Sequence, residues 1–345
     1  MLFRSGDELL IREGTYAVAD GTSTADDIFI RGEGEDLVTI VDGGTIYEML
    51  DFSGSVTLSG FTMDGQGGSA WALSVYGDAA TIEDVSFIDF SLSSGVFSAD
   101  ADDMILRGCR FEGNYRAIIP FDASSFVIED SLFLDNERGI ADGYYGTMPI
   151  ELYNNTFVGG LIQVSGASGI DFTIEDNLFV GATYAPIYDS DETGIIDNNL
   201  FWDNATSTRT GYVLGTNTIE LDPLFVSWSD DGDWTNDDLH LSAGSPALDA
   251  GLYGTSTSDL DDVARPVDGD EDGTATSDLG CYEYEPDSSG GDTGDSGDTG
   301  IDDSSDSGAG VDSGDSTVGA DSGESDADTD TDTDTDTDTD SDTDT

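Results

Sequence analysis

The sequence predicts an all-β fold, a single-stranded parallel β-helix in which short strands wind into a stack of coils. The main observation is a repeat of 22 to 24 residues through the middle of the chain. Segments 82–87, 128–133 and 174–179 read IEDVSF, IEDSLF and IEDNLF. A fixed period of this size is typical of stacked units. Because it is too short for a strand and a crossover helix in every repeat, three short strands and three turns per coil fit best.

One large apolar residue per repeat marks the period, with separations of 24, 24, 22, 24, 22 and 22 residues. Its members are Met63, Phe87, Phe111, Phe133, Phe157, Phe179 and Phe201. An aliphatic residue stands five positions before each: Leu58, Ile82, Leu106, Ile128, Leu152, Ile174 and Ile196. Positions two further back are mostly apolar, and this alternation predicts a strand with one buried face. The aliphatic density is too low for leucine-rich repeats, which share the period.

A second column predicts how the turns are stabilised. Two positions before the large apolar residue stand Phe61, Val85, Cys109, Ser131, Asn155, Asn177 and Asn199. We expect the three asparagines to stack as an amide ladder, each bonding its neighbour or the turn backbone. Gly, Asp and Asn fill the surrounding turns, and each coil should rise by about 4.8 Å.

The opening of the chain carries recognisable phrases. They are GDELLIREGTY at 6–16, VDGG at 41–44 and LSGFTMDG at 58–65. These phrases resemble the first strand and early coils of the pectate-lyase-like superfamily of right-handed β-helix proteins. The resemblance covers residues 6–240 and implies a right-handed solenoid. Members of that superfamily that act on polysaccharides often cleave or epimerise polymers of uronic acids.

Further phrases follow in the C-terminal part. They are DPLFV at 222–226, LHLSAGSPALDAG at 239–251, ARP at 264–266 and DLGCYEYE at 278–285. Their order resembles the terminal module of secreted β-helix proteins called a choice-of-anchor domain, with Cys281 where alanine is usual. The resemblance implies a capping segment that precedes a cell-surface attachment signal. A cap is also expected because the last coil otherwise presents an open strand edge.

We therefore predict a β-helix at 6–240, a capping module at 241–285 and a disordered acidic tail at 286–345. The tail is rich in Asp, Ser, Thr and Gly and ends in alternating Thr and Asp. With almost no apolar residues and one sign of charge, it cannot form a core. A spacer through a cell-envelope layer and a tail that adds only solubility both stay open.

The charge of the chain restricts its partners. It has 75 acidic residues, nine basic residues that are all Arg, and a net charge of −66. The tail holds 21 of the acids, so the predicted folded part is strongly acidic as well. This balance argues against binding nucleic acid or an anionic membrane. It suits a saline or Ca²⁺-rich extracellular setting, or general solubility alone. We expect a monomer whose partner is a polysaccharide or cell-surface glycan.

The ends of the chain and its cysteines add little. There is no apolar run of membrane-spanning length and no visible signal peptide. The chain opens with MLFRS, residues that a common sequencing adapter encodes in frame, so we expect a truncated gene and a missing leader. The expected location is extracellular or at the cell surface. Cys109 and Cys281 are expected to be buried small residues, with a disulfide between them disfavoured.

A pair of arginines gives the main candidate for chemistry. Arg116 and Arg138 each follow a phenylalanine of the repeat by five positions, so they should stack on neighbouring coils. Stacked cations need anions, from the protein or from an acidic sugar. Candidate protein acids are Glu112, Asp122, Glu137 and Asp142. The predicted ligand-binding residues are Tyr115, Arg116, Arg138, Tyr144 and Tyr145, with the tyrosines offering flat faces to sugar rings.

Three functions stay open for this surface. We favour non-catalytic carbohydrate binding or adhesion. A polysaccharide lyase working around Arg116, Arg138 and Asp142 is one alternative, and a structural envelope spacer whose arginines only balance an acidic surface is another. A hydrolase needs paired carboxylates and usually a nearby histidine, but the pair Asp102 and Asp103 has none near it in sequence. The single histidine, His240, is expected to be structural.

One acidic loop is a candidate calcium site. Residues 268–273 read DGDEDG, which matches the first, third, fifth and sixth positions of an EF-hand-like loop. The twelfth position is Leu279 instead of Glu, with Asp278 adjacent. The predicted ligands are Asp268, Asp270, Asp272 and Asp278, in a site that is incomplete or closed differently. An acidic turn that binds no ion is the alternative. No other cofactor is expected.

Overall fold

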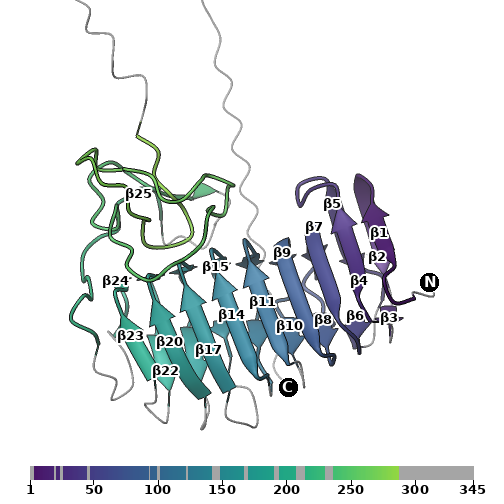
Figure 1. Ribbon diagram of the computed structural model, residues 1–345. Coiled ribbons are helices and arrows are strands. Elements are labelled where there is room, and N and C mark those ends of the chain that lie inside the picture. The colour runs from purple at the N-terminus through teal and green to yellow at the C-terminus, as the bar shows by residue number, and fades with distance from the viewer. Residues whose placement is uncertain are drawn as a thin grey trace, which may run out of the picture. The chain divides into compact units, whose positions relative to one another are not determined.

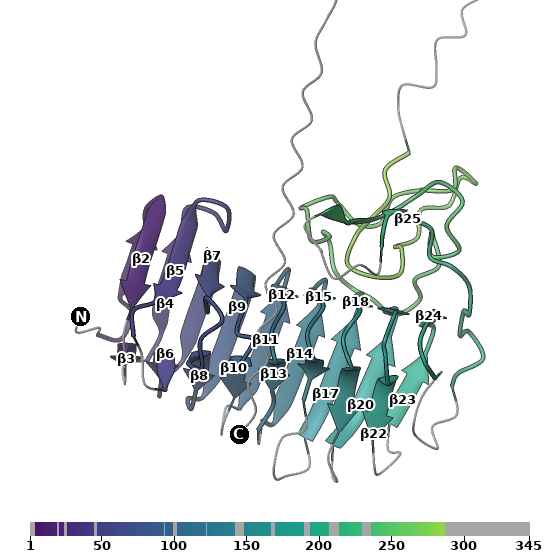
Figure 2. The same cartoon turned by 180° about the vertical axis from the view of Figure 1, so that it is seen from behind.

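The computed structural model confirms a parallel β-solenoid. It describes residues 4–18, 21–23, 26–44, 47–92, 94–98, 102–121, 123–141, 148–166, 170–189, 194–206, 214–229 and 236–286. Within these residues the regular structure is strand, with no α-helix (Figures 1 and 2). The predicted acidic tail lies outside them from residue 287 onward.

Each complete coil contributes strands to three faces, which we call the first, second and third face (Figure 1). The first face contains β1 (Glu8–Ile11), β4 (Ile28–Gly32), the start of β7 (Val56–Asp64), the start of β9 (Ala79–Ile88), β11 (Asp103–Arg107), β14 (Ser125–Glu129), β17 (Met148–Tyr153), β20 (Ile170–Glu175) and β23 (Gly194–Asp197).

The second face contains β2 (Gly14–Val18), β5 (Val38–Asp42), the ends of β7 and β9, β12 (Arg110–Glu112), β15 (Leu132–Leu134), β18 (Thr156–Val158), β21 (Leu178–Val180) and β24 (Leu200–Trp202). The third face contains β3 (Gly21–Ser23), β6 (Glu48–Phe52), β8 (Trp71–Val75), β10 (Ser94–Ser98), β13 (Arg116–Ile119), β16 (Arg138–Ile140), β19 (Ile162–Gly166) and β22 (Ala185–Asp189). β7 and β9 run through both the first and second faces, which joins these faces into one sheet.

The pairing between coils follows the predicted period. Ile128 of β14 pairs with Leu152 of β17, and Phe133 of β15 pairs with Phe157 of β18, in parallel ladders. Residues one repeat apart in sequence are therefore direct neighbours. Equivalent positions of successive coils form columns that run along the solenoid.

The phenylalanine column fills the interior. Consecutive rings lie 4.4 to 5.1 Å apart between centroids and are stacked within 8 to 12° of parallel. The stack runs through Phe87, Phe111, Phe133, Phe157, Phe179 and Phe201, all buried. Stacked aromatic pairs contribute beyond their buried area, by about 0.5–1.5 kcal/mol each. The column therefore stabilises the spacing of the coils as well as the core.

The asparagine column forms the predicted amide ladder. The Asn155 side-chain amide donates to Asn177 Oδ1 at 3.0 Å, and that of Asn177 donates to Asn199 Oδ1 at 3.0 Å. The backbone N–H of Asn155 and of Asn177 donates to the same two oxygens at 2.9 Å. All three side chains are fully buried, and their amides also donate to backbone carbonyls of the preceding coil, Ile128, Leu152 and Ile174.

A second, shorter amide ladder lies at another turn. The Asn114 side chain donates to Asn136 Oδ1 at 2.8 Å, and Asn136 donates to the carbonyl of Phe111 at 2.7 Å. Both asparagines are buried. The sequence repeat did not single out this pair, because the neighbouring coils carry other residues at the equivalent positions.

The corner between the first and second faces requires a left-handed backbone. Seven residues at this corner have φ between +49° and +69°. They are Gly60, Asp84, Gly108, Asp130, Asn154, Asp176 and Asn198. Gly, Asn and Asp are the residues that adopt this conformation at least cost. The local backbone requirement thus places a row of short polar side chains along this edge of the solenoid.

The C-terminal segment, residues 222–286, covers part of the second face. It contains an antiparallel pair, β25 (Phe225–Ser227) and β26 (Asp238–Leu241), and otherwise turns. Leu239, Cys281 and Tyr282 pack on apolar side chains that β15, β18 and β21 turn outward. Both views show this green segment beside the later, teal coils (Figures 1 and 2). Burial of these outward residues explains why the later strands are apolar on both sides.

The polar corner row holds the C-terminal segment in place. The Asp176 carboxylate accepts the backbone N–H groups of Leu252, Tyr253 and Gly254 at 2.6 to 3.1 Å. The Asn154 side chain donates to the carbonyl of Asp278 at 2.9 Å. Side chains selected for the turn thereby also serve as anchoring points.

A buried ion cluster completes this docking. The Arg265 guanidinium, fully buried, lies 3.6 Å from Asp130 Oδ1 and 3.4 Å from Glu283 Oε2, and donates to the carbonyl of Gly280 at 2.7 Å. Burial raises the pKa of Asp130 and of Asp278 to about 7. Several acids share one buried arginine, so ionising all of them in the folded state is unfavourable.

The parallel ladders end with β24, where Leu200 also forms an isolated bridge to Ile219. The boundary at residue 240 between two folding units stays a prediction. Cys109 and Cys281 are both free and buried, as expected. Among the described residues, no helix has the length and apolar character of a membrane span.

We predict that Asn177→Ala lowers the free energy of unfolding by about 3–5 kcal/mol, because it removes several buried hydrogen bonds and leaves their partners unsatisfied. Chemical denaturation followed by circular dichroism measures the change. Asn217→Ala serves as the control, since Asn217 is exposed and, among the described residues, its side chain bonds to Asp197 alone. It should cost no more than about 0.5 kcal/mol. Equal effects of the two substitutions would contradict the ladder.

We also predict that stability falls as pH rises. The pKa values of Asp130 and Asp278 are raised in the folded state, so the folded protein holds more protons than the unfolded chain between about pH 4 and pH 7. The melting temperature at about pH 8 should therefore lie several degrees below that at about pH 5. Asp130→Asn, which tolerates the same backbone, should reduce this difference. An unchanged difference in that variant would refute the assignment.

Candidate functional site

The two predicted arginines lie side by side on the third face. Arg116 begins β13 and Arg138 begins β16, and the two residues pair directly in the parallel register. Ser94 precedes them in this column and Ile162 follows. Both arginines are half-buried. The column thus holds two cationic side chains on adjacent coils, about 4.8 Å apart along the solenoid.

Tyr115 supports the first of these arginines. The Arg116 Cζ lies 5.1 Å from the centroid of the Tyr115 ring, within the range of a cation–π interaction. The Nε of Arg116 is shielded from solvent and has no hydrogen-bond acceptor in the described part of the chain. No carboxylate of those residues forms an ion pair with Arg116. An arginine held by an aromatic ring instead of an acid keeps donors for an external acceptor.

The other residues proposed for this surface have different places. Glu137, next to Arg138 in sequence, is exposed, whereas Glu112 lies on β12 of the second face. Asp122, Asp142, Tyr144 and Tyr145 lie outside the described residues. The described core of the candidate site is therefore Tyr115, Arg116 and Arg138.

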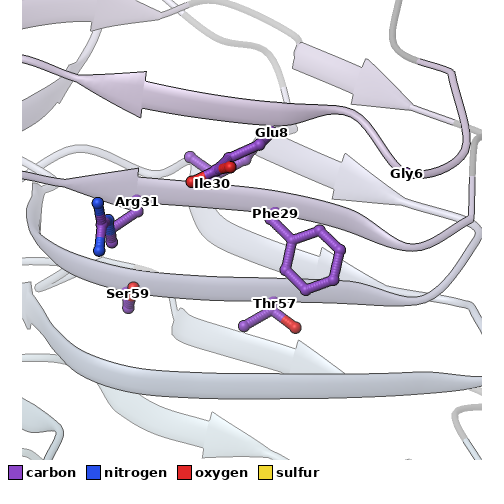
Figure 3. Close-up of a pocket in the computed structure, with 7 residues that line it drawn as sticks. All are labelled: Gly6, Glu8, Phe29, Ile30, Arg31, Thr57 and Ser59. Atoms are coloured by element: carbon purple, nitrogen blue, oxygen red, sulfur yellow. The ribbon is translucent and has the colours of Figure 1, made fainter.

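A hollow of about 360 Å³ on the first face was not anticipated from the sequence. Figure 3 shows Phe29 and Arg31 of β4 beside Thr57 and Ser59 of β7, with Glu8 of β1 at the margin. Phe29 is 46% exposed, although large aromatic side chains are usually buried. An open ring next to hydroxyl groups and an arginine offers both the apolar and polar contacts that a sugar needs.

The acidic loop forms a carboxylate group with one unexpected member. Oxygens of Asp249, Asp268 and Asp270 all lie within 4.8 Å of one another. Asp268 Oδ2 accepts the N–H of Gly273 at 3.0 Å, while its Oδ1 is shielded from solvent without a hydrogen bond. The N–H of Asp270 donates to Asp249 Oδ2 at 2.8 Å. Clustered carboxylate oxygens, one of them unsatisfied, fit a hard divalent cation such as Ca²⁺.

Two of the four predicted calcium ligands lie outside this group. Asp272 caps its own turn by accepting the N–H of Thr274 at 2.8 Å. Asp278 is buried, where it accepts the N–H groups of Asp249 and Tyr284 at 2.7 Å. Asp278 therefore positions Asp249 instead of reaching the cluster itself.

Sequence reasoning missed two sets of residues for different reasons. Phe29 alternates with the buried Ile28 and Ile30, so strand alternation would have identified an exposed aromatic residue. Asp249 lies 19 residues before Asp268, and no periodic signal connects them. Only the folding of the C-terminal segment brings these two carboxylates together.

Comparison with known proteins places the fold. A family model described as "Right handed beta helix region" matches residues 28–201, just over half of the chain. A crystal structure of pectate lyase Pel9A is similar with a TM-score of 0.47 and 15% identity, over 82% of this chain and 89% of that one. A complex of alginate lyase AlyF-OU02 with G6 is similar with a TM-score of 0.39 and 16% identity, over 63% of this chain and 58% of that one.

Likenesses as distant as these two structures say nothing about activity. No curated protein matches the sequence. The family match, in contrast, spans the coils from β4 to β24, where the stacked phenylalanines and asparagines lie. The chain therefore belongs to the right-handed β-helix family.

Proposed function

We propose that this protein binds carbohydrate without chemical turnover, and that Tyr115, Arg116 and Arg138 on the third face form the binding surface. The observation that carries the proposal is the in-register pair Arg116–Arg138, in which Arg116 lies against the Tyr115 ring and forms no ion pair with a described acid. In a chain with 75 acidic residues, an arginine without an acidic partner among the described residues is available to an external anion.

The chemistry of this surface favours an acidic sugar. Guanidinium groups bind carboxylates through paired hydrogen bonds, and the tyrosine ring gives an apolar face for the sugar ring. Arg116 offers its guanidinium to a negative group of an extended glycan, and Arg138 adds a second positive charge on the adjacent coil. The strong negative charge of the chain repels polyanions, so an acidic glycan is expected to contact the protein where arginines lie on the surface.

The hollow around Phe29 gives a further contact surface for the same role. It lies on β1, β4 and β7, far from β13 and β16 in the order of coils. A long glycan, or separate glycans, would engage the two surfaces independently. Adhesion through several weak contacts gains avidity from such repetition.

The setting that we propose is outside the cell, with the solenoid displayed at or beyond the cell surface as a monomer. The excess of acidic residues and the terminal phrases at 222–285 support this setting. The acidic tail would then act as a spacer. The attachment role of the terminal segment remains part of the proposal.

The decisive test compares binding with turnover. We expect the protein to be retained by uronate-containing glycans on an array, and the Arg116→Ala/Arg138→Ala protein to bind at least about tenfold more weakly, which corresponds to about 1.4 kcal/mol. Arg12→Ala is the matched control, because Arg12 is exposed and already paired with Glu33. It should bind like the unmodified protein.

The same samples separate the alternatives. Unsaturated uronate products from alginate or pectin, detected by ultraviolet absorbance and lost in Arg138→Ala, would show a lyase and overturn non-catalytic binding. Absence of both retention and product would leave a structural spacer as the function.

We further propose that Asp249, Asp268 and Asp270 bind Ca²⁺. Calorimetric titration of the full chain with CaCl₂, in about 0.15 M salt to suppress diffuse binding, should reveal a site that Asp268→Asn weakens at least about tenfold, because it removes one carboxylate ligand. Asp272→Asn makes the same charge change in the same loop outside the cluster, and it should have little effect. Equal losses in the two variants would indicate only diffuse attraction to acidic residues.

A further inference from the structure

The C-terminal segment leaves a cleft where its coverage of the second face ends. This cleft, which we call the margin cleft, has a volume of about 500 Å³. One wall comes from β12 and β15 of the solenoid, and the other from Asp237 to His240 and from Tyr282. Volumes of several hundred Å³ at a junction between two packed parts are typical of small-molecule sites.

The base of the margin cleft is apolar. Leu132 and Leu134 of β15 and Tyr282 line it and are almost completely buried. The His240 ring lies 4.2 Å from the Tyr282 ring between centroids, tilted by 33°. His240 and Tyr282 thus form a fixed pair of flat rings at one side of the cleft.

The His240 imidazole is positively charged and is fixed between two carboxylates. One ring nitrogen, Nδ1, lies 2.6 Å from Asp238 Oδ1, and the other, Nε2, lies 2.8 Å from Asp261 Oδ2. The hydrogen bond to Asp261, together with that to Asp238, raises the pKa of His240 to about 9. With both nitrogens bonded to carboxylates, the ring is protonated at neutral pH and can take up no further proton.

Arg110 brings a second cation to the cleft. It lies 3.3 Å from Asp261 Oδ1 and 3.5 Å from Glu35 Oε1. Its Nε is shielded from solvent and makes no hydrogen bond within the described residues. The Nε that makes no hydrogen bond is the atom that faces Glu35 in the ion pair. Asp261 connects Arg110 to His240, because its two oxygens bond one side chain each.

Glu112 is the carboxyl that the solenoid presents to the cleft. It lines the cleft and is only 8% exposed, yet its carboxyl accepts no hydrogen bond in the part of the chain that is described. Burial raises its pKa, against the lowering influence of Arg110. A nearly buried carboxyl that lines a cleft and has no hydrogen bond within the described residues can accept one from a ligand hydroxyl or amine that enters the cleft.

We propose that the margin cleft binds one neutral or amino sugar residue, with Glu112 and Arg110 bonding its polar groups and the His240 ring and the leucines contacting its apolar face. Acidic residues outnumber basic residues around the cleft. The basic residues are Arg110 and His240, and the acidic ones are Glu35, Glu112, Asp237, Asp238 and Asp261. This excess of negative charge disfavours the binding of a negatively charged uronate. The margin cleft lies on a different face from Tyr115, Arg116 and Arg138, and its expected ligand is neutral or positively charged instead of acidic. This proposal therefore does not depend on the third-face surface.

The single histidine of the chain makes a direct test possible. The imidazole resonances of His240 in the full chain can be followed by NMR while methyl glucoside, glucosamine or galacturonate is added. We expect saturable shifts with methyl glucoside or glucosamine, and binding of galacturonate at least about tenfold weaker, equivalent to about 1.4 kcal/mol.

Glu112→Leu fills a similar volume without a polar group, so it should fold and yet weaken sugar binding at least about tenfold because a sugar hydroxyl loses its partner. An unchanged His240 spectrum before sugar addition checks that the cleft is intact. Arg116→Ala/Arg138→Ala should titrate like the unmodified protein, which separates this site from the third face. No shift with either sugar, equal or tighter binding of galacturonate, or unchanged binding in Glu112→Leu would each overturn the proposal.

Discussion

Every feature of this molecule depends on parallel pairing of each coil with the next at a single strand spacing. That pairing leaves buried turns whose polar groups have no solvent, and the Asn155–Asn177–Asn199 ladder satisfies them from coil to coil. The phenylalanine stack imposes the same spacing from the interior. Both columns work only if every coil has the same path, since one displaced coil would break bonds on both of its sides.

The same constraint distributes the chemistry. Because a left-handed corner recurs in every coil, short polar residues collect along one edge, and Asp130 and Asp176 of that edge hold the C-terminal segment. Because positions repeat, Arg116 and Arg138 become neighbours. Where the C-terminal segment stops, outward residues of β12 are half-covered, and Glu112 becomes a buried carboxyl beside open space. One kind of candidate site, such as the arginine pair, comes from equivalent positions in successive coils. The other kind, such as the margin cleft, lies where the C-terminal segment stops covering the second face.

This distinction explains what the sequence can predict. Phe133, Asn177 and Arg138 belong to periodic columns, so their neighbours follow from counting residues. Asp249 and His240 belong to a segment without a repeat, and their partners Asp268 and Asp261 are set by one irregular path. The acidic loop at 268–273 could be recognised in the sequence, but the sequence did not show which of its carboxylates lie close together. Asp278, for example, is buried away from the cluster, where its carboxylate accepts backbone N–H groups.

Coupling between stacked side chains tests this architecture most directly. In a double-mutant cycle with leucine substitutions, Phe133 and Phe157, whose rings lie 4.4 Å apart, should show a coupling energy of about 0.5–1.5 kcal/mol. Phe133 and Phe179, separated by one coil, should be additive within about 0.5 kcal/mol. Additivity in the first pair, or equal coupling in both, would contradict a stack in which each coil contacts only its neighbours.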